Sequence, residues 1–306
     1  MLKRTLTGAV IFLVTALMIL SRSLSIYFFD FFVMTVSFVA TYEIIKANIK
    51  EEEMLNLPIK NVSYIYLPLV YCYLTYLAYS LSRSILHSLI YQASLFLLVV
   101  LVAFVWDLIY LSKLRKENVE LPKHLLLRGT KLTALTMFYP ITLIGTLYGF
   151  GIAGMSSSLG TTLIILIFAV TMSTDVFAYL FGMAFHKGVL ASQISPKKSI
   201  SGAIGGLVGG VVASAVTFVI CNFVLTVNPF AGYPLWKVIT FFSLSGVLGS
   251  VFVQIGDLIA SAIKRRVDIK DFGNIFPGHG GMMDRIDGLM FASTLILVLS
   301  ILLLYI

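Results

Sequence analysis

Long apolar stretches, separated by short polar segments, make up most of this 306-residue chain. A bilayer core about 30 Å thick needs about 20 mostly apolar residues per helix, and most of the stretches approach or exceed that length. The pattern therefore predicts an all-α fold, a polytopic membrane helix bundle of about nine transmembrane helices. The expected spans are residues 5–20, 25–45, 62–81, 85–111, 131–150, 159–181, 203–227, 236–263 and 288–306.

Positive charge alternates along this pattern of spans. Short cytoplasmic loops of membrane proteins are enriched in lysine and arginine. If the N-terminus is cytoplasmic, only Arg22, Arg83 and Lys237 of the 22 lysine and arginine residues fall on the outer side. We therefore predict a cytoplasmic N-terminus and a functional site on the cytoplasmic side. The chain divides into residues 1–150, which hold spans one to five, and residues 151–306, which hold spans six to nine with a polar signature at 261–287.

Composition excludes several classes of protein. The chain is 59% hydrophobic and 12% charged, whereas a soluble domain carries about 25% charged residues. Soluble, disordered and disulfide-stabilised folds are therefore excluded. A net charge of +8 would suggest nucleic-acid binding in a soluble protein, but here the charge collects on one membrane face and no nucleic-acid partner is expected. Cys72 and Cys221 lie in apolar runs without metal-ligand spacing and are expected to pack.

Glycines at a spacing of four residues begin the seventh span. Gly202, Gly206 and Gly210 share one helix face, and faces of small residues allow close helix contact in lipid. Packing inside the bundle is the favoured interpretation of this face, and a homodimer interface is the alternative.

Acidic residues within spans are costly to bury and usually functional. Asp107, Asp175 and Asp257 lie near the inner ends of spans four, six and eight. A carboxylate at a helix C-terminus faces the negative end of the helix dipole, so it needs a basic side chain or a metal ion nearby. Asp30, in the outer half of span two, lies among phenylalanines and is interpreted as structural.

The inner end of span eight carries a polar stripe. Three- and four-residue spacings place its members on one helix face, and they are Gln254, Asp257, Ser261 and Lys264. The alternative is an interfacial ion pair with a lysine that extends to the membrane surface. On the stripe alone the two interpretations are balanced.

A glycine-rich segment at 276–281 precedes the last span and favours a phosphate site. Glycine lets backbone N–H groups approach an anion, and the helix that follows offers its positive end to phosphate. Asp284 and Asp287 share a face of the opening turn, and Mg²⁺ takes such oxygen ligands together with substrate phosphates. Basic residues that can neutralise the phosphate charge are Lys264, Arg265, Lys270 and Arg285. The segment predicts Mg²⁺-dependent phosphoryl or nucleotidyl transfer to a membrane-bound substrate.

This polar signature resembles that of the phosphatidate cytidylyltransferase family, also called CDP-diacylglycerol synthases. The segments that carry the resemblance are residues 261–265, 270–273 and 276–287. Similar family segments lie upstream, at residues 195–199 with Gly202 and at Asp175, Tyr179 and Gly182. The chain departs from the family pattern at Met183, His186, Ile200 and Ser201. The first half resembles the family only as hydrophobic spans.

The resemblance implies that CTP and membrane-embedded phosphatidate are converted to CDP-diacylglycerol and pyrophosphate, with Mg²⁺ as cofactor and room for a second cation. The implied metal ligands are Asp257, Asp284 and Asp287. The implied catalytic residues are Lys264, Arg265, Lys270, Asp271, His279 and Arg285. Substrate binding is expected at Ser195, Lys197, Lys198, Ser261, Gly280, Gly281 and Asp175.

Two other functions fit parts of the pattern. A CTP-dependent lipid kinase acting on a polyprenol or phytol would also need cytoplasmic acids and lysines, but it is not expected to carry this whole signature. An ion-coupled transporter would place its acids near the bilayer midplane in repeated halves, whereas here the acids cluster at one surface and no internal repeat is found. We expect a multi-pass protein of the plasma membrane with its site on the cytoplasmic side.

Overall fold

The computed structural model describes residues 2–54, 63–82, 84–119, 127–151, 157–225 and 228–305. Lys60, Arg83 and Lys123, which contribute to the predicted orientation, lie outside these described residues. The first half of the chain contains α1 (Leu2–Leu24), α2 (Ile26–Met54), α3 (Ser63–Ser80), α4 (Ile85–Lys116), α5 (Arg128–Thr136), η2 (Met137–Thr142), α6 (Leu143–Gly145) and η3 (Thr146–Gly151).

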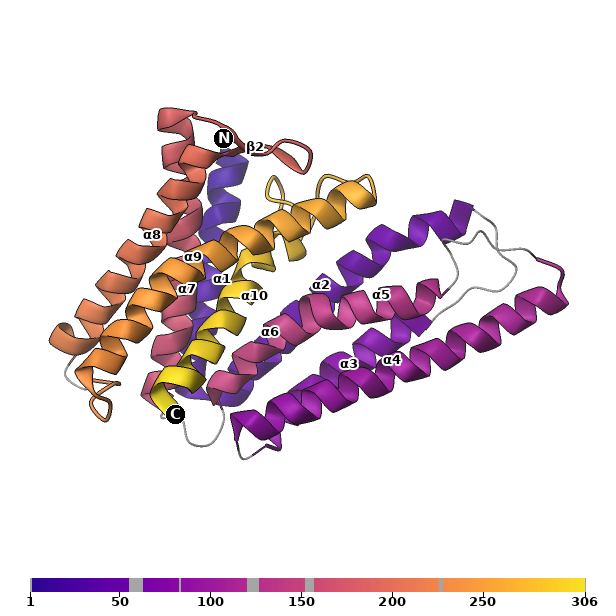
Figure 1. Ribbon diagram of the computed structural model, residues 1–306, viewed down its shortest axis with the longest axis horizontal. Helices are drawn as coiled ribbons and strands as arrows, with labels where there is room; N and C mark the ends of the chain where they lie inside the picture. Colours follow the sequence, from indigo (N-terminus) through magenta and orange to yellow (C-terminus); the bar gives the residue numbers. More distant parts are fainter. Residues whose placement is uncertain are drawn as a thin grey trace.

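The second half holds the longest helix pairs. Its elements are α7 (Ser157–Phe185), β1 (Val189–Ala191), β2 (Ser195–Ser199), α8 (Ile200–Val219), η4 (Ile220–Val224), α9 (Leu235–Arg266), α10 (Met283–Ser300) and η5 (Ile301–Tyr305). Helices α7, α8, α9 and α10 lie at one side of the molecule, and α3, α4 and α5 lie at the other (Figure 1). Contacts cross between the halves, from α1 to α7 and from α2 to α10, so the division at residue 150 stays a prediction.

The helices have the length and composition of membrane spans. Each of the nine expected segments overlaps a helix, and within the described residues seven helices are long and apolar enough to cross a bilayer. Helix α1 offers only the shorter apolar stretch Gly8–Arg22, and α3 is not among the seven. The all-α, polytopic membrane fold is thus confirmed and the chain is an integral membrane protein. The number nine and the orientation of the N-terminus stay predictions.

The glycine face of α8 packs inside the bundle. A Cβ atom added at Gly202 would lie 2.9 Å from the carbonyl oxygen of Ala178 on α7, and one added at Gly210 would lie 2.6 Å from Cβ of Ser250 on α9. Gly206, between them, is also buried. These approaches require glycine, and they confirm the favoured interpretation of this face.

The span predicted at 131–150 is interrupted, which the hydrophobic pattern does not reveal. Tyr139 has φ −125° and ψ 100° within η2, and Pro140 follows it. Proline has no N–H for the helical hydrogen bond, and its ring collides with the preceding turn. The segment therefore crosses as several short helical pieces instead of one regular helix.

A β-hairpin joins α7 to α8, where no strand was expected. Strands β1 and β2 are antiparallel, with Val189 paired with Ser199, and β2 contacts α9. Pro196 and two lysines give this polar segment no alternating apolar pattern, so the sequence carries no strand signal. The hairpin brings residues 195–199 to the carboxyl end of α9 (Figure 1).

Candidate active site

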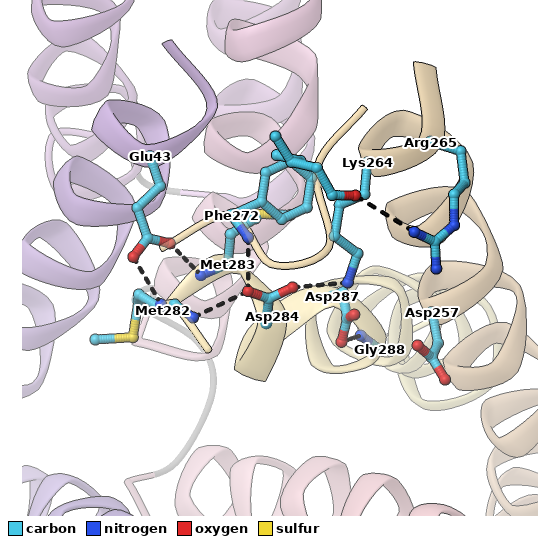
Figure 2. A network of polar contacts seen from close by, with 12 residues as sticks. Glu43, Asp257, Lys264, Arg265, Phe272, Met282, Met283, Asp284, Asp287 and Gly288 are labelled. Carbon is cyan, nitrogen blue, oxygen red and sulfur yellow. Dashed lines mark hydrogen bonds and ion pairs between the residues drawn. The ribbon is translucent and has the colours of Figure 1, made fainter. Parts of the chain in front are cut away.

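Asp284 joins three parts of the signature. It lies in the first turn of α10, and its side chain is 3% exposed. Oδ1 accepts a hydrogen bond from Nζ of Lys264 on α9 at 2.7 Å, and Oδ2 accepts one from each of the backbone N–H groups of Phe272 and Gly281, both at 2.9 Å (Figure 2). One buried carboxylate thus holds the end of α9 and both ends of the loop 272–281 against α10.

The loop 272–281 turns sharply at Gly280, beside Asp284. Gly280 has φ +84°, and a Cβ atom there would lie 2.8 Å from Oδ2 of Asp284. Both the backbone angle and the space favour glycine. The backbone N–H of Phe276 donates to the carbonyl oxygen of Gly280 at 2.9 Å, and the N–H of His279 donates to that of Phe276 at 2.9 Å. These bonds fold the tip of the loop into a compact turn.

Glu43 on α2 occupies the amino end of α10, where the sequence predicted a phosphate. Its Oε1 accepts a hydrogen bond from the N–H of Met282 at 3.0 Å, and its Oε2 accepts one from the N–H of Met283 at 2.9 Å (Figure 2). The prediction that this helix end is open to substrate is therefore wrong. Glu43 was missed, although an acid inside an apolar span is the same signal that selected the aspartates.

The other predicted metal ligands lie on closely packed turns of α9 and α10. A Cβ atom at Gly256 would lie 2.4 Å from the carbonyl oxygen of Asp287, so the helices nearly touch beside Asp257. Oδ1 of Asp287 accepts the N–H of Gly288 at 2.9 Å, and its carboxylate is within electrostatic reach of Asp257, Asp175 and Lys264. Asp257, with a side chain 38% exposed, forms an ion pair with Lys198 of β2.

A cavity of about 710 Å³ lies beneath the hairpin and is called the hairpin cavity. Predicted site residues in its lining are Asp175, Lys197, Lys198 and Asp257. Gln254 of the polar stripe, the family-like Tyr179 and Gly182, and the two departures Met183 and His186 line it as well. Charged groups of both signs therefore meet apolar side chains in one space, as a phosphate-bearing lipid or nucleotide requires.

A second, polar cavity of about 460 Å³ is called the loop cavity. Its lining includes Lys270, Asp271, His279, Gly280 and Arg285. Basic side chains beside backbone of a glycine-rich turn are suited to bind phosphate oxygens. The loop thus retains the character of a phosphate site, although the helix end beside it is filled by Glu43.

Several predicted residues lie in neither lining. Arg265 points from α9 to the hairpin, where its Nε donates to the carbonyl oxygen of Ile194 at 3.4 Å. Ser195 on β2 and Ser261 on α9 do not belong to either lining, and Gly281 serves Asp284 through its N–H. The polar stripe of α9 therefore separates: Asp257 faces the hairpin cavity, whereas Lys264 binds Asp284.

Asp107 is placed away from both cavities. Its Oδ2 accepts hydrogen bonds from the N–H of Thr130 at 2.7 Å and from the Thr130 hydroxyl at 2.8 Å, at the beginning of α5. A carboxylate at this position satisfies backbone donors at a helix amino end. Its role is therefore to join α4 to α5.

The carboxylates of the site are suited to a metal ion that also binds substrate phosphates, as Mg²⁺ does, and not to an ion held by protein side chains alone. Among the described residues, no group of three or more His, Cys, Asp or Glu side chains has the proximity to hold a metal ion by itself. Mg²⁺ is usually bound through one or two carboxylates together with water and substrate phosphates. Such an arrangement would fit Asp257 in the hairpin cavity, with Asp287 on the adjacent turn of α10. Both oxygens of Asp284 already accept hydrogen bonds, so a metal ion there would displace Lys264 or a backbone donor.

Comparison with known proteins indicates the family to which this site belongs. A model of the cytidylyltransferase family matches residues 2–303. A phosphatidate cytidylyltransferase of Brucella abortus biovar 1 (strain 9-941) is 36% identical over 137 residues, 45% of this chain and 46% of that protein. Proteins of the same name from Staphylococcus haemolyticus and Rickettsia felis are 34% identical over 142 residues and 37% over 140 residues, each 46% of this chain and respectively 50% and 59% of the relative. The matched part spans about half the length of these curated relatives.

Proposed function

This chain belongs to the cytidylyltransferase family, and from this premise we propose that it is a phosphatidate cytidylyltransferase of a membrane. It would convert CTP and phosphatidate to CDP-diacylglycerol and pyrophosphate. The observation that carries the proposal is the convergence of the signature on Asp284, with further charged signature residues in the linings of two cavities. The printed names of the relatives support the choice of substrates.

The reaction needs charge neutralisation more than proton transfer. A phosphate oxygen of phosphatidate forms a bond to the α-phosphorus of CTP, while the bond between that phosphorus and the bridging oxygen breaks and pyrophosphate leaves with the electron pair. The attacking phosphate is already anionic at neutral pH, so no strong general base is required. In such transfers, positioning and electrostatic stabilisation supply most of the rate enhancement.

The basic residues of the two cavities fit this requirement. Lys197 and Lys198 line the hairpin cavity, and Lys270 and Arg285 line the loop cavity. We assign them to phosphate oxygens of the two substrates, with His279 as a further donor in the loop cavity. Phosphate groups drawn to these positions would be held next to the carboxylates of α9 and α10.

We propose that Asp257 and Asp287 hold Mg²⁺ together with phosphate oxygens of the substrates, and that Asp284 joins them by exchanging Lys264 for the ion. The bound ion would neutralise charge on the reacting phosphates. A second cation would find a further carboxylate ligand in Asp175, which also lines the hairpin cavity. Without the ion, Lys264 holds Asp284 in place through their ion pair of 2.7 Å.

We place the site at the cytoplasmic face of a plasma membrane with nine spans, because this arrangement leaves only three of the 22 lysine and arginine residues outside. All the residues that we assign to the site belong to this chain.

The test uses purified protein in lipid nanodiscs with CTP labelled either on the base or on the γ-phosphate. With phosphatidate and Mg²⁺, we expect base label in the lipid fraction and γ-phosphate label in pyrophosphate. A lipid kinase would give the opposite pattern, with γ-phosphate label on an added polyprenol or phytol. That pattern, or no labelled lipid with either substrate, would contradict the proposal.

A further inference from the structure

Glu43 is a buried acid that lies far from the signature in sequence but contacts it in space. The residue is 3% exposed and belongs to α2, in the half of the chain where the hydrophobic pattern carries no motif. Its two carboxylate oxygens accept hydrogen bonds from the consecutive N–H groups of Met282 and Met283, which are 239 and 240 residues away. Figure 2 shows the carboxylate pointing at the first turn of α10.

The position of the Glu43 carboxylate is explained by the free N–H groups at the amino end of a helix. The first N–H groups of a helix have no partner within the helix, and they carry the positive end of the helix dipole. A buried carboxylate is costly unless it is hydrogen-bonded, and here both oxygens receive donors. The observed contact satisfies the acid of α2 and the amino end of α10 together.

The loop packs so closely against Glu43 that a side chain at either of two glycines would displace the Glu43 carboxylate. A Cβ atom at Gly281 would lie 2.4 Å and 2.5 Å from the two carboxylate oxygens of Glu43, and one at Gly273 would lie 2.1 Å from Oε1. The N–H groups of the neighbouring Phe272 and of Gly281 bind Asp284 instead. Both ends of the loop are thus held between two carboxylates, one from α2 and one from α10.

We infer that Glu43 is a positioning residue for the reaction, a role that rests on the proposed function. It fixes the first turn of α10 and the ends of the loop, and through them the carboxylates of Asp284 and Asp287. It does not line either cavity, so it acts on the reacting groups through α10 and not by touching substrate. The first half of the chain thereby contributes directly to the geometry of the site.

The kinetic test compares Glu43→Ala with Glu117→Ala, which removes an exposed carboxylate at the end of α4. We expect Glu43→Ala to lower kcat by roughly 100-fold, because small displacements of positioned groups cost about this much. The KM values for CTP and phosphatidate should change much less, and Glu117→Ala should behave like the wild type. Added formate, which fits the space left by the carboxylate, should restore part of the lost kcat.

Glu43→Gln tests the same role with a side chain of equal size. Its amide can accept from only one of the two N–H groups and directs an NH₂ group at the other, so kcat should fall without rescue by formate. Wild-type kcat in both Glu43 variants would overturn the inference. So would higher KM values at unchanged kcat, because they would place Glu43 at the substrate.

A second measurement does not depend on activity and separates this inference from the proposed function. Gly281→Ala should lower the melting temperature by roughly 2–4 °C when Glu43 is present, and by much less in the Glu43→Ala background, where the collision is gone. Gly232→Ala, a position with nothing within 4 Å of an added Cβ, is the control. Equal losses in both backgrounds would overturn the contact with Glu43, whereas inactive protein with the expected coupling would overturn only the proposed reaction.

Discussion

Asp284 and Asp257 carry the same functional group in different surroundings. Asp284 is buried and accepts bonds from Lys264 and two backbone N–H groups, whereas Asp257 is 38% exposed and pairs with Lys198. Leaving buried donors without an acceptor costs about 1–3 kcal/mol, but an exposed ion pair contributes only about 0–1 kcal/mol. The same substitution should therefore affect folding at one position and not at the other.

We predict that Asp284→Asn abolishes turnover and lowers thermal stability, because the amide cannot accept all three bonds and leaves Lys264 without its acid. Asp257→Asn should lower turnover with a melting temperature close to that of the wild type. Turnover and thermal unfolding of the two purified variants check this prediction. Wild-type turnover in Asp284→Asn, or the same loss of stability in both variants, would show that the two carboxylates do not differ as described.

Single residues of the site could be predicted where their neighbours in sequence carry the signal. The spacing of Asp284 and Asp287, and of Asp257 and Lys264, places each pair on one helix face whatever the tertiary fold. Glu43 could not be connected to the loop in this way, because its partners are 239 residues away or more. The filling of a helix end by a distant acid depends on packing, and the sequence pattern of α10 alone leaves that end open.

At the scale of elements, the hairpin supplies Lys198 to Asp257, the single carboxylate of α9. We predict that Lys198→Gln raises the KM for CTP or for phosphatidate by about tenfold, since a hydrogen bond from a charged donor contributes about 1.5 kcal/mol or more. Stability should hardly change, because the ion pair with Asp257 is partly exposed. Steady-state kinetics with each substrate varied will measure the effect.

Lys116→Gln, on the exposed end of α4, is the matched control and should leave both KM values unchanged. If Lys198→Gln binds both substrates as the wild type does, the hairpin cavity is not a phosphate site. A higher KM for only one substrate would identify which of the two occupies the hairpin cavity.

Helices were predicted better than the segments that join them. Apolar stretches of sufficient length form helices almost regardless of neighbours, because backbone groups in lipid must find partners within the segment. The hairpin gives no signal of this kind, whereas Pro140 is visible in the sequence inside the span that it interrupts. Two acids, Asp107 and Glu43, hold the amino ends of α5 and α10 from neighbouring helices, which is tertiary information.

At the scale of the whole molecule, the distribution of lysine and arginine predicts which loops face the cytoplasm. Single cysteines placed at Asp268 and at Gly232, in a chain whose Cys72 and Cys221 are replaced, can test this with a membrane-impermeant maleimide on intact cells. We expect Gly232→Cys to react from outside and Asp268→Cys to react only after the membrane is opened. The reverse pattern would invert the predicted orientation and move the site to the other face.

The two halves of the chain were predictable to different degrees. The second half carries the residues of the signature, so its chemistry could be read from local patterns. The first half offers mainly apolar spans, yet α2 contacts α10 and places Glu43 on the loop. The family model matches residues 2–303 and so covers both halves, but only the packing of distant helices reveals the contact of Glu43 with Met282 and Met283.

The most direct test of the account is mass spectrometry of the lipid formed by purified protein from CTP, phosphatidate and Mg²⁺, with pyrophosphate measured in the same reaction. The account predicts phosphatidate enlarged by one cytidine monophosphate unit, one pyrophosphate for each lipid formed, and neither product with Asp284→Asn. Unchanged phosphatidate with the wild-type protein, or the same products at the same rate with Asp284→Asn, would contradict it.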